Sequence, residues 1–258
     1  MEGMRRRTLL GAGATVATLA TVAGYRRRTA EEEPVMPAAP AGEQRLRQLP
    51  SAARGRTVDV YTAVPQGHGD GRGLPVCLIL HGGTKRPADY AGLGLGRFLT
   101  DAVRRGAPPF VLVGADGGGL AWRPAGADDP QRMVHEEIPA WCRRFGYDTG
   151  RMAAWGWSLG GYGSLLLAEA YPGFVRAVAA FSPAVRPDDD VTRQAGLLRG
   201  TRVGLWCGKQ DGLYYDVRTL EKELPEGKAA GSYGDGRHNF GFWSRCVPDA
   251  FAFVARSL

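Results

Sequence analysis

Cysteine is scarce in this chain of 258 residues, and its placement limits the chemistry that the chain can perform. The four cysteines, Cys77, Cys142, Cys207 and Cys246, do not show the spacing of metal ligands. The sequence therefore predicts no metal site and no cofactor. In an oxidising compartment Cys142 and Cys246, the pair that looks less buried, could form a disulfide, but the sequence alone does not predict that bond.

The body of the chain also lacks an excess of charge of either sign. The formal net charge of +7 comes mostly from residues 1–28, which contain six arginines and a single acidic residue. The remainder has 27 basic and 25 acidic residues. A nearly neutral body does not favour nucleic acid as a partner. The partner expected instead is a small molecule or a lipid, and this expectation rests on the motifs described below rather than on the charge.

The N-terminus is expected to direct the protein out of the cytoplasm. Arg5, Arg6 and Arg7 are followed closely by two leucines, and residues 8–25 carry no charge. This arrangement resembles a bacterial twin-arginine export signal, which carries folded proteins across the inner membrane. The predicted location is therefore extracytoplasmic.

Residues 1–28 are predicted to be either an export signal or an N-terminal membrane anchor. The 18 uncharged residues 8–25 approach the ~20 that a membrane-spanning helix needs, so they could associate with the membrane. Cleavage near residues 21–23 or 39–41 would instead release the protein. Residues 29–50 are rich in proline, alanine and acidic side chains, which predicts a disordered linker before a domain over residues 51–258.

Beyond the linker, segments typical of strands alternate with segments typical of helices. Predicted strands cover residues 56–65, 74–80, 109–114, 151–157, 175–181, 202–208 and 228–233. Predicted helical segments include residues 90–105, 132–145, 164–170, 215–224 and 239–257. Such alternation forms βαβ units, so the predicted class is α/β, with a mostly parallel central sheet and helices on both faces. Functional residues are then expected beyond the carboxyl ends of the strands.

A Gly-x-Ser-x-Gly pentapeptide places Ser158 between the strand that ends at Trp157 and a helical segment. This is the context of a nucleophile elbow, a sharp turn that exposes the serine hydroxyl. Gly156 and Gly160 would give the backbone of that turn the room that it needs. The pentapeptide alone is weak evidence in a chain with 38 glycines, but its position between strand and helix makes Ser158 the predicted nucleophile.

A serine hydroxyl needs a base within hydrogen-bond reach, and that base needs a carboxylate to orient it. If the three residues come in the order serine, acid, histidine, the base is His238, because the other histidines precede Ser158. Asp211, three residues beyond a predicted strand, is the predicted acid. Asp216 and the acidic residues 188–190 remain alternatives at this point.

Two backbone N–H groups are expected to form an oxyanion hole. One is that of Leu159, which follows the serine, and the other belongs to Gly83 or Thr84 in the loop after an earlier strand. His81 lies two residues before Gly83 in this loop. It is expected to shape the loop by packing or by a hydrogen bond.

Four residues near these motifs are predicted to contact the substrate: Trp157, Tyr162, Trp122 and Arg123. The aromatic side chains could contact an acyl group, and packing in the core is their alternative role. Arg123 could bind an acidic substrate or form a surface ion pair.

Several segments resemble the putative-esterase family of the α/β-hydrolase superfamily, which includes esterase D (S-formylglutathione hydrolase) and the antigen 85 mycolyltransferases. The resemblance rests on residues 156–165 and on the later segments Tyr-Pro-Gly-Phe (171–174), Phe-Ser-Pro-Ala (181–184), Cys-Gly-Lys-Gln-Asp (207–211) and His-Asn-Phe-Gly-Phe-Trp (238–243). It implies an α/β-hydrolase fold, an esterase or acyltransferase activity, a Ser-Asp/Glu-His triad and no metal.

We therefore expect an exported serine esterase that hydrolyses a carboxylic or thio ester through an acyl-enzyme at Ser158. The first alternative is an acyltransferase, similar to a mycolyltransferase, that uses the same site. The second is a non-catalytic binding protein of the cell envelope that keeps the hydrolase fold.

Overall fold

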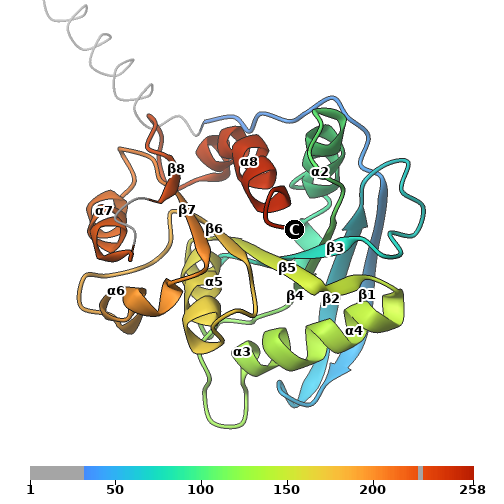
Figure 1. The fold of residues 1–258 in the computed structure, drawn as a ribbon, viewed down its shortest axis with the longest axis horizontal. Coiled ribbons are helices and arrows are strands. Elements are labelled where there is room, and N and C mark those ends of the chain that lie inside the picture. The colour runs from blue at the N-terminus through green and yellow to red at the C-terminus, as the bar shows by residue number, and fades with distance from the viewer. Residues whose placement is uncertain (1–31, 226–228) are drawn as a thin grey trace, which may run out of the picture.

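The computed structural model describes residues 32–225 and 229–258, and the predicted export signal lies outside these ranges. Eight strands form one sheet, which helices cover on both faces (Figure 1). The strands are β1 (Glu43–Ser51), β2 (Arg56–Val64), β3 (Pro75–Leu80), β4 (Val111–Ala115), β5 (Asp148–Trp157), β6 (Ala177–Phe181), β7 (Arg202–Trp206) and β8 (Ala230–Ser232).

Helices occupy most of the connections between these strands. They are η1 (Pro87–Asp89), α2 (Leu95–Arg104), α3 (Pro130–Arg132), η2 (Met133–Glu137), α4 (Ile138–Phe145), α5 (Leu159–Ala170), α6 (Asp190–Arg193), η3 (Ala195–Leu198), α7 (Tyr214–Glu223) and α8 (Phe240–Ala255). Within the ranges that the structure describes, none of them combines the length and the apolar character needed to cross a membrane.

The strands lie in the order β1-β2-β4-β3-β5-β6-β7-β8. β1 and β2 run antiparallel to their neighbours, whereas all the pairings from β4 through β8 are parallel. Every residue of β3 is buried, as expected for a strand that is covered by helices on both faces. The predicted α/β class, with its mostly parallel sheet and two helical layers, is confirmed.

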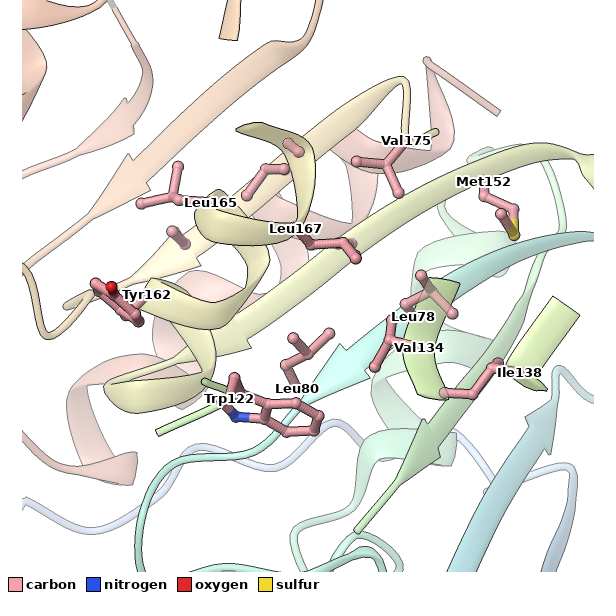
Figure 2. Packing of buried hydrophobic residues seen from close by; sticks show 14 of the residues in the cluster. Leu78, Leu80, Trp122, Val134, Ile138, Met152, Tyr162, Leu165, Leu167 and Val175 are labelled. Atoms are coloured by element: carbon pink, nitrogen blue, oxygen red, sulfur yellow. The ribbon is translucent and has the colours of Figure 1, made fainter. Parts of the chain in front are cut away.

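Alternate residues of the strands supply two hydrophobic cores on opposite faces of the sheet. Leu78 and Leu80 of β3 belong to the core beneath α4 and α5, together with Leu165 (Figure 2). Cys77 and Ile79 point the other way, into the core beneath α2 and α8. The sheet is thus held between two helical layers, which fixes the positions of the loops at its carboxyl edge.

The prediction of a disordered linker was wrong for residues 43–50, which form most of β1. This strand pairs with β2 along its whole length. It lies at the edge of the sheet, and its residues are mostly exposed or half-buried. It therefore lacks the apolar alternation from which a strand is recognised, and polar side chains are common at such edges.

All four cysteines are buried and free. Cys142 packs in the core beneath α4, and Cys246 packs in the core beneath α8, so the sheet separates them. Burial raises the pKa of each thiol to about 12, which keeps both protonated at neutral pH. Both residues are thus buried like the other two cysteines, and they form no disulfide with each other.

Candidate active site

Ser158 occupies a sharp turn between β5 and α5. Its backbone has φ 55° and ψ −122°, a conformation that residues other than glycine rarely adopt. Three backbone hydrogen bonds hold the turn. The Ser158 N–H donates to Phe181 O at 2.9 Å, and the Ser158 carbonyl accepts from the N–H groups of Tyr162 at 3.1 Å and Ala184 at 3.0 Å.

The two flanking glycines leave the space that this turn requires. A Cβ at Gly156 would lie 2.3 Å from Gly160 O, and a Cβ at Gly160 would lie 1.8 Å from Leu80 O. Both distances are far below van der Waals contact, so any larger residue would push the turn away from β3. The strand–turn–helix context predicted for Ser158 is present.

The structure brings Ser158, His238 and Asp211 together. Nε2 of His238 lies 2.9 Å from Ser158 Oγ, and Nδ1 lies 2.8 Å from Asp211 Oδ2. Because an ionised carboxylate only accepts hydrogen bonds, Nδ1 carries the hydrogen, and the neutral ring presents an unprotonated Nε2 to the serine hydroxyl. Asp211 lies in the loop after β7 and His238 in the loop after β8, both at the carboxyl edge of the sheet.

Asp211 is buried, and hydrogen bonds compensate for its burial. Burial alone would raise its pKa, but hydrogen bonds from His238, the Ser182 hydroxyl and the Leu213 N–H outweigh this effect and lower the pKa. The Ser182 hydroxyl is fixed in turn, because Nε1–H of Trp243 donates to it at 3.0 Å. Asp211 therefore stays ionised at neutral pH, as a carboxylate that orients an imidazole must.

The other acids considered from the sequence lie elsewhere. Asp189 caps the N-terminus of α6, and Asp190 forms ion pairs with two arginines. Asp216 lies in the first turn of α7. Among the residues that the structure describes, Asp211 is the carboxylate that contacts His238.

The predicted oxyanion-hole residues meet beside Ser158. Leu159, Gly83 and Thr84 all line the cavity that contains the serine. Leu159 is the first residue of α5, so its N–H is one of the amide groups without an acceptor inside the helix. Gly83 lies close to it, since a Cβ on Gly83 would be 3.2 Å from Leu159 Cδ1.

His81 connects this loop to the loop that follows β4, as expected of a residue that shapes it. Its buried Nε2 accepts a hydrogen bond from Gly117 N–H at 2.9 Å, so Nδ1 carries the hydrogen and donates to Gly82 O at 2.8 Å. Asp116 Oδ1 approaches the same Nε2 only at 3.4 Å. The His81 carbonyl accepts from Nε1–H of Trp122 at 3.0 Å. The loop is thus held from two sides.

A cavity of about 510 Å³ opens beside Ser158 and His238. Its apolar walls include Pro34, Leu93, Trp157, Phe240 and Trp243. Two charged residues, Glu32 and Lys85, also line it. A cavity of this size and character can hold a small organic group next to the serine.

Trp157 lines this cavity, but the structure gives the other three predicted substrate contacts different roles. Trp122 is only 2% exposed and packs beneath α5. Tyr162 is also buried, and the guanidinium of Arg123 lies 5.0 Å from the centre of its ring. Arg123 pairs with Asp190 at 3.5 Å. None of these three residues lines the cavity beside Ser158, and their contacts are those of the alternative roles, packing and a surface ion pair. A contact with substrate stays a prediction for them.

Two features of the site were missed from the sequence. One is the support of Asp211 by Ser182 and Trp243, for which the resemblance of residues 238–243 to the family was the available signal. The other is the contribution of Glu32 and Pro34 to the cavity. No local pattern signals that contribution, because it depends on how the segment before β1 packs in the folded domain.

Two of three comparisons with known proteins found matches to this chain. The family model described as "Putative esterase" matches residues 51–243. No curated protein sequence matches the chain. Among solved structures, a ferulic acid esterase has a TM-score of 0.73 and 17% identity, with 84% of this chain and 99% of that chain covered.

Two further structures extend this likeness. An S-formylglutathione hydrolase from Agrobacterium tumefaciens has a TM-score of 0.70 and 20% identity, with 87% of this chain and 98% of that chain covered. MPT51 of Mycobacterium tuberculosis has a TM-score of 0.67 and 16% identity, with 84% of this chain and 99% of that chain covered. At these identities the likeness shows a shared fold alone.

Proposed function

This chain belongs to the putative-esterase family, and on that premise we propose that it is a serine hydrolase that cleaves carboxylic or thio esters. The observation that carries the proposal is the hydrogen-bonded array of Ser158, His238 and Asp211, with distances of 2.9 and 2.8 Å. Only the unprotonated Nε2 of such an array can accept the serine proton.

In the first half-reaction, Ser158 Oγ attacks the carbonyl carbon of the ester while its proton passes to His238 Nε2. The carbonyl electrons move to the oxygen, and the N–H groups of Leu159 and of Gly83 or Thr84 stabilise the resulting oxyanion. The tetrahedral intermediate then expels the alcohol or thiol, which takes the proton from Nε2. The acyl group is left on Ser158.

In the second half-reaction, water gives a proton to His238 Nε2 and attacks the acyl carbon. A second oxyanion forms in the same place, and its collapse breaks the bond to Ser158 Oγ, which recovers the proton. Asp211 stabilises the imidazolium in both halves, and its lowered pKa means that it does so as a carboxylate.

An acyltransferase would share the first half-reaction and differ in the second, where an alcohol would replace water. Hydrolysis predicts that the acyl group appears as free acid even when glycerol or a sugar is present in excess. Acylation of the alcohol in most turnovers would favour the acyltransferase. A protein that only binds ligands would have no use for an aligned base, so the array argues against that alternative.

The proposal is tested by labelling the purified full chain with a fluorophosphonate probe, which reacts with activated serines. Ser158→Ala is expected to abolish labelling, whereas Ser232→Ala, at an exposed position on β8, serves as the matched control and should keep it. A folded wild-type protein that does not label would overturn the mechanism. Labelling that survives Ser158→Ala would assign the activity to another residue.

We also propose that residues 1–28 export the protein by the twin-arginine route. The support is the sequence of Arg5, Arg6 and Arg7 followed by the uncharged residues 8–25. Replacement of the three arginines by lysine is expected to hold the protein in the cytoplasm of a bacterial host. Export of that variant at the wild-type level would contradict this route.

A further inference from the structure

The segment before β1 crosses the ends of two helices on its way to the edge of the sheet. We call residues 32–42 the N-terminal strap. In Figure 1 it follows the grey N-terminal trace, passes α8 and then α2, and continues into β1. It has no helix or strand of its own. Its contacts with the two helices fix its course.

Contacts with α8 hold the first part of the strap. The Val35 N–H donates a hydrogen bond to Ser244 Oγ at 2.9 Å, across 209 positions of sequence. Glu32 forms an ion pair with Arg245 at 2.8 Å. The strap also lies directly on the helix, because a Cβ on Gly241 would be 1.9 Å from Glu32 O.

Contacts with α2 hold the second part. Nε–H of Arg97 donates to Ala39 O at 3.1 Å. The backbone of Gly96 comes so close to the strap that a Cβ there would lie 2.4 Å from Ala41 O. The strap is therefore packed at both ends, which distinguishes it from a loose connection.

We propose that the N-terminal strap determines substrate specificity by forming one wall of the cavity beside Ser158. Glu32 and Pro34 line this cavity together with Phe240 of α8 and Trp157. The Glu32 carboxylate is engaged by Arg245, so Pro34 is the part of the wall that presents an apolar surface. The wall limits the size of the acyl or alcohol group, and its removal opens the cavity to larger esters. This inference rests on the proposed esterase function.

The proposal gives the two candidate cleavage sites different consequences. Cleavage near residues 21–23 would retain the strap, whereas cleavage near residues 39–41 would remove Glu32 and Pro34. A protein processed at the second site is expected to have a more open cavity.

The test compares full-length variants on p-nitrophenyl esters from acetate to decanoate. Pro34→Gly removes the wall side chain, and Ser244→Ala removes the acceptor that holds Val35 without changing the cavity lining. Glu33→Ala is the matched control, since Glu33 lies on the strap but does not line the cavity. We expect the decanoate-to-acetate ratio of kcat/KM to rise at least about fivefold in the two test variants. The reason is that one methylene group too many or too few in a hydrophobic pocket can change kcat/KM about 10-fold or more. The control should stay within about twofold of the wild type.

The outcomes separate this inference from the esterase proposal. An active wild type whose ratio is unchanged in Pro34→Gly overturns the inference alone. A wild type that hydrolyses none of the esters overturns both. Hydrogen exchange of the peptide that covers residues 32–42 gives an independent measure: Ser244→Ala should speed exchange of the Val35 amide, and unchanged exchange would show that the strap is not held as described.

Discussion

Gln210 and Gly236 join the two loops that carry Asp211 and His238. The Gly236 N–H donates to Gln210 Oε1 at 2.7 Å, and the Gln210 N–H donates to Gly236 O at 3.0 Å. Gln210 is adjacent to Asp211, and Gly236 is two residues before His238. This reciprocal pair therefore fixes the separation of carboxylate and imidazole, although neither residue lines the cavity beside Ser158.

Gln210→Ala removes one of these two hydrogen bonds and is expected to lower kcat about 10-fold with little change in KM. The reason is that small displacements of a reacting group can cost up to about 10²-fold in rate. Gln210→Glu keeps an acceptor for the Gly236 N–H and should stay within about threefold of the wild type. Steady-state kinetics on a short ester measure both, and full activity of the alanine variant would show that the loops do not need this pair.

Asp211→Asn tests the role of charge at constant shape. A neutral amide can donate as well as accept, so it neither enforces the Nδ1–H tautomer of His238 nor stabilises its imidazolium. The equivalent change in a serine-protease triad lowers kcat about 10⁴-fold, and we expect a loss of ~10³-fold or more here. Asp188→Asn, at an exposed position in the alternative acidic run, is the control and should retain activity. Similar losses in the two variants would remove Asp211 from the mechanism.

His81→Ala is expected to weaken stabilisation of the oxyanion. Without the imidazole, the Gly82 carbonyl and the Gly117 N–H lose their shared partner, and the loop that carries Gly83 is no longer fixed. Loss of one oxyanion donor costs about 10²–10³-fold in kcat, so partial misplacement should cost about 10-fold or more.

The readout for His81→Ala is the affinity of a boronic-acid analogue of the tetrahedral intermediate, which should fall in parallel with kcat. His68→Ala, in a distant loop, is the control and should change neither quantity. A fall in thermal stability with unchanged affinity for the analogue would give His81 a structural role only.

The local features of the site could be predicted from the sequence because they depend on neighbours in the chain. Gly156 and Gly160 flank Ser158 within one turn, and their contacts with each other and with β3 follow from that turn. The order of Ser158, Asp211 and His238 was informative because each follows a strand of one parallel sheet. The carboxyl ends of such strands meet at one edge, which brings distant residues together.

Features that depend on packing between distant segments could not be predicted in this way. The hydrogen bond from Val35 to Ser244 spans 209 positions of sequence. Residues 32–42 show no repeat and no alternation of apolar and polar residues from which this contact could be predicted. Trp122 shows a second kind of ambiguity in the sequence. An aromatic residue near a motif can line a cavity or fill a core, and only the folded structure shows that Trp122 packs beneath α5.

Glu169 of α5 is a buried acid outside the site, and one of its carboxyl oxygens has no hydrogen-bond partner among the described residues. Burial, together with the nearby charges of Asp189 and Asp190, raises its pKa from an ordinary 4.5 to about 8. Between these values the folded protein binds more protons than the unfolded chain. Stability therefore falls as pH rises from about 4.5 to about 8.

Glu169→Gln removes this titration and keeps the shape of the side chain. The melting temperature of the variant is expected to be close to that of the wild type near pH 4.5 and higher by about 5 °C or more at pH 8, where the buried carboxyl costs the wild type a few kcal/mol. Calorimetry at the two pH values measures the difference. An equal offset at both would mean that Glu169 does not titrate between them, because any purely steric effect of glutamine is independent of pH.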